Sequence, residues 1–290
     1  MVRGHMEEKI LNGKALADQL NSELKQKISS HIKKRSIKPT LATLLVGNDP
    51  ASEIYINIKR KTGLEVGIDT KIIHLDRNSS KVQVIQEINQ LNVEENIHAI
   101  LLQLPLPAHL KKDLPSIIAE IVPNKDVDGL HPQNLGDLFY KNEKLAPCTP
   151  KGIIHLLDHY DIPLKGKNIT IINHSTLLGR PLSQMFLNRE ATVSICHAFT
   201  RNIETHTRNA DILVVGIGIP NFIQRKHLKP GAIIIDVGIN RIEGKLCGDV
   251  DFDNVKDKVS KITPVPGGVG PMTVAKLLEN TYILYKKKTN

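Results

Sequence analysis

Short apolar runs alternate with helix-like segments along most of this 290-residue chain, and no other feature restricts its fold as strongly. Strands that alternate with helices pair in parallel, because each helix carries the chain back to the same end of the sheet. The first part of the sequence therefore predicts a parallel α/β sheet. The expected elements are strands at 41–46, 70–75 and 99–102, and helices at 14–30, 52–65 and 79–92.

The alternation is interrupted by a stretch rich in Pro, Gly and Asn at 123–150, which we interpret as a link between domains. A second series follows it, so the sequence predicts two α/β domains: 7–147, completed by a C-terminal helix at 271–290, and 148–270. The expected elements are helices at 151–159, 181–189 and 274–285, and strands at 168–172, 191–196, 212–215 and 232–237.

Charge and composition narrow the classes of partner. The chain has 39 Lys and Arg residues against 30 Asp and Glu residues, a net charge of +9. The basic residues are spread along the sequence and aromatic residues make up only 3%, so the stacking surfaces of nucleic-acid-binding proteins are not expected. No apolar run approaches the ~20 residues that span a bilayer. We expect no nucleic-acid or membrane partner. We interpret the excess of basic residues as a solvated surface, and the alternative is a surface that steers an anionic small substrate.

The cysteines and the first residues indicate the cellular compartment in which the protein is expected. Cys148, Cys196 and Cys247 are odd in number and widely spaced, without a Cys-X-X-Cys motif. We therefore expect a reducing, cytoplasmic compartment, and neither a disulfide framework nor a metal site. The start lacks the apolar segment of a signal peptide and precedes a second methionine, so residues 1–5 are interpreted as an addition ahead of the native start.

Three features of the first domain could carry chemistry, and each is weak by itself. Tyr55 and Lys59 are four residues apart and project from one helix face, where a ring and an amine could hold a flat substrate. A lysine serves as a base only where its pKa falls, and a plain surface helix is the alternative. Gln103 ends a buried strand, the place where α/β sheets gather ligands. Asp126 and Asp128 could bind the N–H groups of a heterocycle or form a turn.

In the second domain, strand 168–172 is followed by a polar turn and a helix, the unit that binds dinucleotides. The turn 173–181 has one glycine in place of a G-x-G-x-x-G motif, and its N–H groups could meet a phosphate. NAD enzymes commonly carry an acid after the next strand, but 191–203 contains none, which favours a 2′-phosphate and therefore NADP. The basic side chains expected nearby are His174, His197 and Arg201.

Together and in this order, these features resemble the bifunctional methylenetetrahydrofolate dehydrogenase/methenyltetrahydrofolate cyclohydrolase family, from about residue 10 to residue 285. The most specific block is 264–273, whose glycines among prolines could pass close to a bound ring or act as a hinge. The blocks that carry the resemblance are SEIYINIK at 52–59, LQLPLP at 102–107, KDVDG at 125–129 and PVPGGVGPMT at 264–273, with IDVGIN at 235–240 and GDVD at 248–251.

The resemblance implies an α/β fold of two domains, an N-terminal α/β catalytic domain and a C-terminal Rossmann-type NADP-binding domain with a cleft between them, in a homodimer. Lys59 matches the catalytic lysine, Gln103 its partner, Tyr55 the ring that packs on the folate, and Asp128 the pterin-binding acid. The other substrate-binding positions are Leu102, Leu104, Pro266, Gly267, Gly268, Val269, Gly270 and Pro271. The cofactor-binding positions are Asn173, His174, Ser175, His197, Ala198, Arg201, Gly218, Ile239 and Thr273.

The implied chemistry is oxidation of 5,10-methylene-tetrahydrofolate to 5,10-methenyl-tetrahydrofolate with NADP, and its hydrolysis to 10-formyl-tetrahydrofolate. The substrates would be polyglutamylated folates of one-carbon metabolism, which feeds purine biosynthesis. Three departures lie in the cofactor domain: Asn173-His174-Ser175 in place of Gly-Arg-Ser or Gly-Ala-Ser, Ala198 in place of Ser or Arg, and Gly216 in place of Ala. NAD thus stays possible, and the alternatives are an NAD-preferring dehydrogenase with weak cyclohydrolase activity and a non-catalytic folate-binding protein.

Overall fold

The computed structural model describes residues 8–289, so the interpretation of residues 1–5 lies outside the described part. The chain divides into two compact units. The first unit consists of Gln19–Gly136 with the described residues from Val274 onward, and the second of the described residues up to Asp18 with Asp137–Thr273. Within residues 8–289, no helix is both long and apolar enough to cross a membrane.

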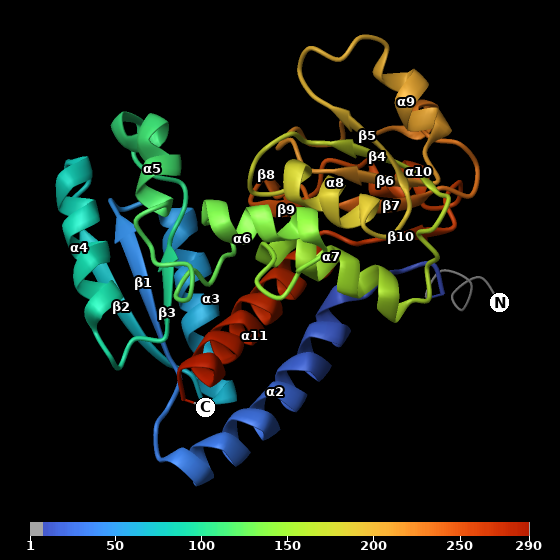
Figure 1. Cartoon of the computed structure of the whole chain (residues 1–290). Coiled ribbons are helices and arrows are strands. Elements are labelled where there is room, and N and C mark those ends of the chain that lie inside the picture. The colour runs from blue at the N-terminus through green and yellow to red at the C-terminus, as the bar shows by residue number, and fades with distance from the viewer. Residues whose placement is uncertain (1–7, 290) are drawn as a thin grey trace. The chain divides into compact units, whose positions relative to one another are not determined.

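A three-stranded parallel sheet organises the first unit, with strand order β2-β1-β3 (Figure 1). The central strand is buried along most of its length, which is why its sequence is almost continuously apolar. The strands are β1 (Thr40–Val46), β2 (Asp69–Leu75) and β3 (Ala99–Leu102). The helices are α2 (Gly13–Arg35), α3 (Pro50–Val66), α4 (Lys81–Val93), η1 (Ala108–Asp113), α5 (Leu114–Ile118), α6 (Pro132–Asp137) and α11 (Val269–Thr289).

Local chemistry explains where α3 and α4 begin and end. The Asp49 carboxylate accepts the N–H of Ser52 at the start of α3, and Pro50 occupies the first turn, where its missing N–H costs nothing. The helix ends at Gly67, whose φ of 94° is left-handed. Ser80 and Gln83 form a reciprocal capping box at the start of α4. These signals fix the register of α3, and with it the positions of Tyr55 and Lys59.

The helices α4 and α5 cover one face of this sheet and α3 the other (Figure 1). Apolar side chains of α4, α5 and the segments after β3 pack with β1 and β3 into one buried cluster. Burial of such side chains contributes roughly 1.5–3 kcal/mol each relative to exposure. The leucines and isoleucines of the cluster are Leu44, Ile88, Leu91, Ile97, Ile100, Leu102, Leu106, Leu110, Ile117, Ile118, Ile121 and Leu130.

A buried histidine in this unit makes its stability depend on pH. His98 is 3% exposed, and its Nδ1 accepts the Thr40 N–H at 3.1 Å. Burial, followed by the charges of Lys288 and Lys125, lowers the pKa of His98 to about 4. The unfolded chain binds this proton at about pH 6.5. The stability that neutral His98 contributes is therefore present above about pH 6.5 and is lost as the pH falls towards 4.

Chemical denaturation at about pH 7 and about pH 5 checks this expectation. The free energy of unfolding should fall by about 2 kcal/mol more in the wild type than in His98→Asn, whose amide oxygen can accept the same N–H but does not titrate. The comparison is needed because burial raises the pKa of Asp126 and of Asp236, which act in the opposite direction. Equal pH dependence in the two proteins would show that His98 is not the responsible group.

A five-stranded parallel sheet forms the centre of the second unit, with order β10-β7-β6-β4-β5. Its strands are β4 (Asn168–Ile172), β5 (Thr192–Cys196), β6 (Ile212–Val215), β7 (Ile233–Asp236) and β10 (Lys261–Ile262), and β8 (Asn240–Ile242) with β9 (Lys245–Cys247) forms a separate hairpin. The remaining elements are η2 (Leu138–Tyr140), α7 (Cys148–His159), α8 (Gly179–Leu187), α9 (Ile203–Asn209), η3 (Arg225–His227) and α10 (Phe252–Val255).

The strand order of this sheet reverses at β4. The chain passes from β4 outward to β5, and then returns past β4 to β6 on the other side. In open α/β sheets ligands bind outside the carboxyl ends of the strands at such a reversal, because the connections leave in opposite directions and open a crevice. The topology therefore points to the turns after β4 and β6.

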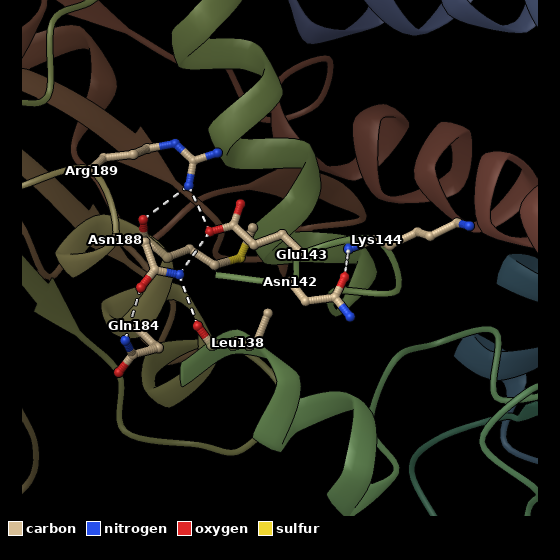
Figure 2. A network of polar contacts seen from close by, with 8 residues as sticks. Leu138, Asn142, Glu143, Lys144, Gln184, Asn188 and Arg189 are labelled. Atoms are coloured by element: carbon tan, nitrogen blue, oxygen red, sulfur yellow. Dashed lines mark hydrogen bonds and ion pairs between the residues drawn. The ribbon is translucent and has the colours of Figure 1, made fainter. Parts of the chain in front are cut away.

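The segment 137–147 packs with the second unit, earlier than the boundary at 148 that the sequence suggested. Figure 2 shows the contacts responsible. The Glu143 carboxylate accepts hydrogen bonds from Arg189 at 2.8 Å and from the Asn188 amide at 3.1 Å. The same amide donates to the Leu138 carbonyl at 2.9 Å. These polar contacts attach the segment to the end of α8, which sequence periodicity could not indicate.

Two expectations from the sequence are wrong in detail: the nature of the stretch 123–150 and the start of the last helix. The stretch 123–150 is not a plain link, because it contains α6, η2 and the first residues of α7. The last helix begins at Val269, five residues before the expected start at Val274. Gly270 and Pro271 therefore lie in the first turn of α11, where proline is tolerated because its N–H would have no helical partner. The short elements η1, α5, α9, α10 and the β8–β9 hairpin were not expected.

Candidate functional site

Lys59 and Gln103 meet in the first unit. Lys59 lies on α3, one turn after Tyr55, and Gln103 directly follows the last residue of β3. The Lys59 ammonium nitrogen donates to the Gln103 side-chain oxygen at 3.0 Å. Gln103 is buried, while Tyr55 and Lys59 are half-buried. The arrangement joins an amine, an amide and an aromatic ring at the carboxyl end of a parallel strand, where ligands of such sheets bind.

The orientation of the Gln103 amide is set by the chain that follows it. Its Nε2 donates to the Leu104 carbonyl at 2.7 Å, so its oxygen is the atom that remains for Lys59. The Leu104 carbonyl also accepts the Ser52 hydroxyl at 3.3 Å, and that hydroxyl lies 2.8 Å from the Asp49 carboxylate. The start of α3 and the turn after β3 are thereby joined. Ser52 was not singled out in the sequence, although it opens one of the blocks that carry the resemblance.

The block at 125–129 separates into structural residues and one available acid. Buried Lys125 donates to the Leu91 and Glu94 carbonyls at 2.8 Å each, and so satisfies the end of α4. Asp126 is 2% exposed and accepts the Asn134 amide and a backbone N–H, both at 2.8 Å. Asp128 is half-buried. Of the two acids, Asp126 is used by contacts within the fold and Asp128 is the more accessible.

Backbone pairing brings this acid toward Gln103. Ile100 of β3 forms a parallel bridge with Asp126, and the Ile100 N–H donates to the Lys125 carbonyl at 2.7 Å. Leu102 lies two residues after Ile100, and Asp128 lies two residues after Asp126. Because the two segments run parallel, Asp128 approaches the carboxyl end of β3, where Leu102 is the last residue. Sequence spacing could not reveal this pairing, because 26 positions separate the bridged residues.

The turn after β4 is held by Asn173 in the second unit. The Asn173 side-chain oxygen accepts the N–H groups of Ser175 and Gly179 at 2.9 and 3.1 Å. Its amide nitrogen donates to the carbonyl of Gly216, which directly follows β6, at 2.5 Å. One side chain therefore joins both turns of the strand-order reversal. The sequence marked Asn173 as a departure from the family pattern, and the structure assigns it this bridging contact.

Close packing excludes a side chain at one of these glycines and crowds a second. A Cβ atom on Gly179 would lie 1.9 Å from the Asn173 carbonyl oxygen, so no side chain fits there. A Cβ atom on Gly216 would lie 2.9 Å from a terminal carbon of Leu178 and 3.2 Å from Val237. Gly218 differs: its φ is +71° and a Cβ atom there would meet nothing within 4 Å. The turn after β6 thus leaves open space beside its backbone, as a bound dinucleotide requires.

Two buried carboxylates support this turn. Asp249 accepts the N–H groups of Ile217 and Gly218 at 2.6 and 3.0 Å, and Asn240 donates to its other oxygen at 2.8 Å. Asp236 accepts the N–H of Asp249 at 3.0 Å, and burial raises the pKa of Asp236 to about 6. The runs at 235–240 and 248–251 are therefore a support for the β6 turn. Together these two runs position the turn after β6, a role that the sequence did not indicate.

The backbone N–H groups at the start of α8 are partly used within the turn. Those of Ser175, Leu178 and Gly179 donate to side chains of the turn, whereas no residue of 8–289 accepts those of Thr176 and Leu177. The latter two residues are exposed. The turn therefore fits a phosphate with fewer N–H donors than the sequence suggested.

The loop 266–268, which precedes α11, packs against residues 13 and 14 at the start of α2. The Lys14 N–H donates to the Gly267 carbonyl at 2.8 Å, and a Cβ atom on Gly13 would lie 1.9 Å from the Gly268 carbonyl oxygen. The Thr273 and Thr149 hydroxyls are 3.0 Å apart. These contacts give the loop 266–268 a defined backbone and place Thr273 on the first turns of α11.

The predicted residues accordingly fall into separate groups. Tyr55, Leu102, Gln103 and Leu104 lie with Lys59 and Asp128 in the first unit, and Pro266–Thr273 lies in the second. In the second unit, Asn173, His174 and Ser175 follow β4, His197 and Ala198 follow β5, and Gly218 follows β6. Arg201 is exposed after β5, and Ile239, at 50% exposure, precedes β8.

A parallel sheet whose order reverses beside an open glycine turn, and a second parallel sheet ending in a lysine–amide pair, define a two-domain α/β enzyme with a dinucleotide-binding unit. Residues 11–128 match the domain described as "Tetrahydrofolate dehydrogenase/cyclohydrolase, catalytic domain", and residues 147–289 match the "NAD(P)-binding domain" of the same family. The chain therefore belongs to the tetrahydrofolate dehydrogenase/cyclohydrolase family, and is a bifunctional enzyme of that family.

Similar proteins extend over nearly the whole chain. "Bifunctional protein FolD" of Aquifex aeolicus is 49% identical over 280 residues, 96% of each protein. The crystal structure of a bifunctional FolD enzyme from Campylobacter jejuni is 47% identical, covers 96% of this chain and 98% of its own, and has a TM-score of 0.92. A Trypanosoma brucei FolD structure, complexed with NADP cofactor and an inhibitor, is 33% identical with a TM-score of 0.91, and covers 96% and 97%.

Proposed function

We propose that this enzyme oxidises 5,10-methylene-tetrahydrofolate with NADP and hydrolyses the 5,10-methenyl product to 10-formyl-tetrahydrofolate, with Lys59 as the group that handles protons. The single observation that carries the assignment of Lys59 is its 3.0 Å hydrogen bond to Gln103 at the carboxyl end of β3. A bound nicotinamide supplies the acceptor for the hydride. The protein's part is to hold the folate, orient it and move protons.

The residues of the first unit divide these tasks by their chemistry. The Tyr55 ring can pack against the flat face of the pterin, and the Asp128 carboxylate can accept the pterin's N–H groups. In the hydrolysis, water attacks the methenyl carbon and a proton must leave, for which an amine in a defined position can act as general base. Gln103 is a neutral partner, so it fixes the position of the Lys59 nitrogen without forming an ion pair.

Tight packing and open space in the second unit fit a dinucleotide. Gly179 leaves no room for a side chain at the start of α8, and Gly218 leaves open space after β6. Asn173, Ser175, Ala198, Gly218 and Ile239 would line the nucleotide, and the loop 266–271 with Thr273 would line the reacting rings. The stretch 191–203 has no acid to hold a ribose diol, which supports NADP over NAD.

The cysteines, the net charge and an edge strand support a cellular setting and an assembly. Three free cysteines fit a reducing compartment, the cytoplasm, where one-carbon units are used in purine biosynthesis. The net charge of +9 would attract polyglutamylated folates. The edge strand β5 carries Ile195, which is 39% exposed, and Leu187, the last residue of the adjoining helix α8, is 51% exposed. An edge strand with apolar neighbours can pair with a second copy, which supports a homodimer.

A spectrophotometric assay with 5,10-methylene-tetrahydrofolate and each nicotinamide cofactor tests the proposal. We expect reduction of NADP to proceed faster than reduction of NAD, and methenyl-tetrahydrofolate supplied directly to be hydrolysed. Faster reduction of NAD with slow hydrolysis would support an NAD-preferring dehydrogenase with weak cyclohydrolase activity. Folate binding without either turnover would identify a non-catalytic binding protein.

A further inference from the structure

A buried asparagine on the last helix contacts the segment that carries Asp128. Asn280 lies on α11 and is 0% exposed, and its amide donates to the Val127 carbonyl at 2.9 Å. The two residues are 153 positions apart, and both belong to the first unit. A polar side chain buried in a helix costs free energy unless it forms hydrogen bonds, a cost that an apolar residue would avoid. The bond to Val127 is therefore a contact that asparagine provides here and that an apolar residue could not.

The carbonyl that accepts this hydrogen bond belongs to the peptide group between Val127 and Asp128. A peptide group is planar, so its carbonyl and the N–H of the next residue rotate together. Asn280 therefore fixes the plane from which the Asp128 backbone continues. Val127 is also 0% exposed, and its N–H donates to the Ile100 carbonyl at 3.3 Å. The residue before Asp128 is thus held by β3 through its N–H and by α11 through its carbonyl.

The chain is fixed on both sides of Asp128, so a rotation of this peptide must appear at Asp128 itself. On one side, the Asp126 carboxylate accepts the His131 N–H and the Asn134 amide, both at 2.8 Å. On the other side, Gly129 turns the chain with a left-handed φ of 70°. Asp128, between them in the chain, is half-buried. Because hydrogen bonds weaken steeply as their angle departs from linear, a carboxylate that binds a heterocycle has to keep its direction.

We propose that Asn280 is a positioning residue for folate binding, which directs the Asp128 carboxylate toward the pterin by holding the Val127 carbonyl. The inference rests on the proposed role of Asp128 in accepting the N–H groups of the pterin. Asn280 acts on the substrate through Asp128, whereas Lys59 is positioned by a separate hydrogen bond to Gln103 at 3.0 Å. Loss of the Asn280 amide should therefore weaken binding of the folate far more than it slows proton transfer.

Steady-state hydrolysis of 5,10-methenyl-tetrahydrofolate by Asn280→Leu measures this effect. Leucine has nearly the same branched shape as asparagine but has no hydrogen to donate. We expect KM to rise roughly 10-fold, as on loss of a hydrogen bond to a charged group, and kcat to fall by less than about 3-fold. Asn280→Ala, which removes the amide without adding an apolar group, replaces the leucine variant if circular dichroism shows that the latter does not fold.

The matched control is Thr281→Val, one residue further along α11. Thr281 is also 0% exposed, and its hydroxyl donates to the Leu277 carbonyl at 2.9 Å, within the same helix. The change removes a buried hydrogen bond of α11 and leaves the donor to the Val127 carbonyl in place. The KM of this variant should match that of the wild type, even where thermal unfolding shows a loss of stability comparable with that of Asn280→Leu.

A double-mutant cycle with Asp128→Asn separates positioning of the carboxylate from support of the fold. Two changes that act on one interaction are not additive, because the second has nothing further to remove. Asp128→Asn alone should raise KM, and in that background Asn280→Leu should change KM by less than about 2-fold. A full rise in KM in both backgrounds, an unchanged KM in a folded Asn280 variant, or an equal rise in Thr281→Val would each overturn the inference.

Failure of the proposed function gives different results. A wild-type enzyme that does not hydrolyse methenyl-tetrahydrofolate would refute the proposed activity, and this inference with it. An unchanged KM in Asp128→Asn would refute the proposed role of Asp128 in the same way. A raised KM in Asp128→Asn beside wild-type kinetics in Asn280→Leu would leave that role in place and reject the positioning by Asn280 alone.

Discussion

Replacing Lys59 with alanine is expected to lower the rate of methenyl-tetrahydrofolate hydrolysis by about 10²- to 10⁴-fold, the range by which a positioned proton-transfer group accelerates such a step. The physical reason is that Gln103, the partner of Lys59 at 3.0 Å, is a neutral amide that cannot accept the proton itself. The change removes a half-buried side chain from α3 and leaves the apolar cluster of the first unit intact. The fold and the binding of NADPH should therefore persist.

The matched control is Lys61→Ala, which removes an exposed lysine from the same helix. Its hydrolysis rate should match the wild type, and circular dichroism should show both variants folded. A second variant, Gln103→Leu, removes the oxygen that positions the amine and should lower kcat more than it raises KM. Wild-type hydrolysis by a folded Lys59→Ala protein would rule out Lys59 as the proton-transferring group.

Gly179→Ala is expected to have the largest effect on the second unit. The new methyl group would lie 1.9 Å from the Asn173 carbonyl oxygen, 2.5 Å from its carbon and 3.0 Å from the His174 nitrogen. All three are backbone atoms that cannot rotate away, so the turn must deform, at a cost of about 1–3 kcal/mol or more. Because this turn joins β4 to β6 through Asn173, we expect NADPH affinity to fall at least roughly 10-fold.

Two further glycine variants make the comparison quantitative. Gly136→Ala places a methyl group where nothing lies within 4 Å, in a helix, and should leave stability unchanged or slightly raised. Gly216→Ala approaches a terminal carbon of the Leu178 side chain at 2.9 Å, which can move, so its effect should be intermediate. Thermal unfolding and NADPH titration measure the series. Tight NADPH binding by Gly179→Ala would show that the turn is not part of the nucleotide site.

Local sequence signals predicted much of the fold correctly. Apolar runs and helical periodicity located the strands β1 to β7 and the helices α2, α3, α4, α7 and α8 to within a few residues, because these signals depend on neighbours along the chain. The prediction that Tyr55 and Lys59 share a helix is likewise confirmed. Membership of the family rested on motif order, and the family matches confirm it.

Local signals could not predict contacts between residues that are far apart in the chain. Spacing alone left Asp126 and Asp128 equivalent, and the resemblance to the family selected Asp128. The pairing of 126 with Ile100 and the burial of Asp126 give the physical distinction between the two acids. Likewise, the sequence presented 235–240 and 248–251 as separate runs, and only their folding together shows that Asp236 and Asp249 support the turn after β6.

The sequence alone thus determined the kind of chain: two parallel α/β units, the helix that carries Lys59, and the turn that opens α8. The tertiary structure decided which groups meet. It set the strand order that reverses at β4, the Lys59–Gln103 hydrogen bond across 44 positions, and the Asn280–Val127 hydrogen bond across 153 positions. The reason is physical, because periodicity is a property of a few consecutive residues, whereas a site forms only when packing brings separate strand ends together.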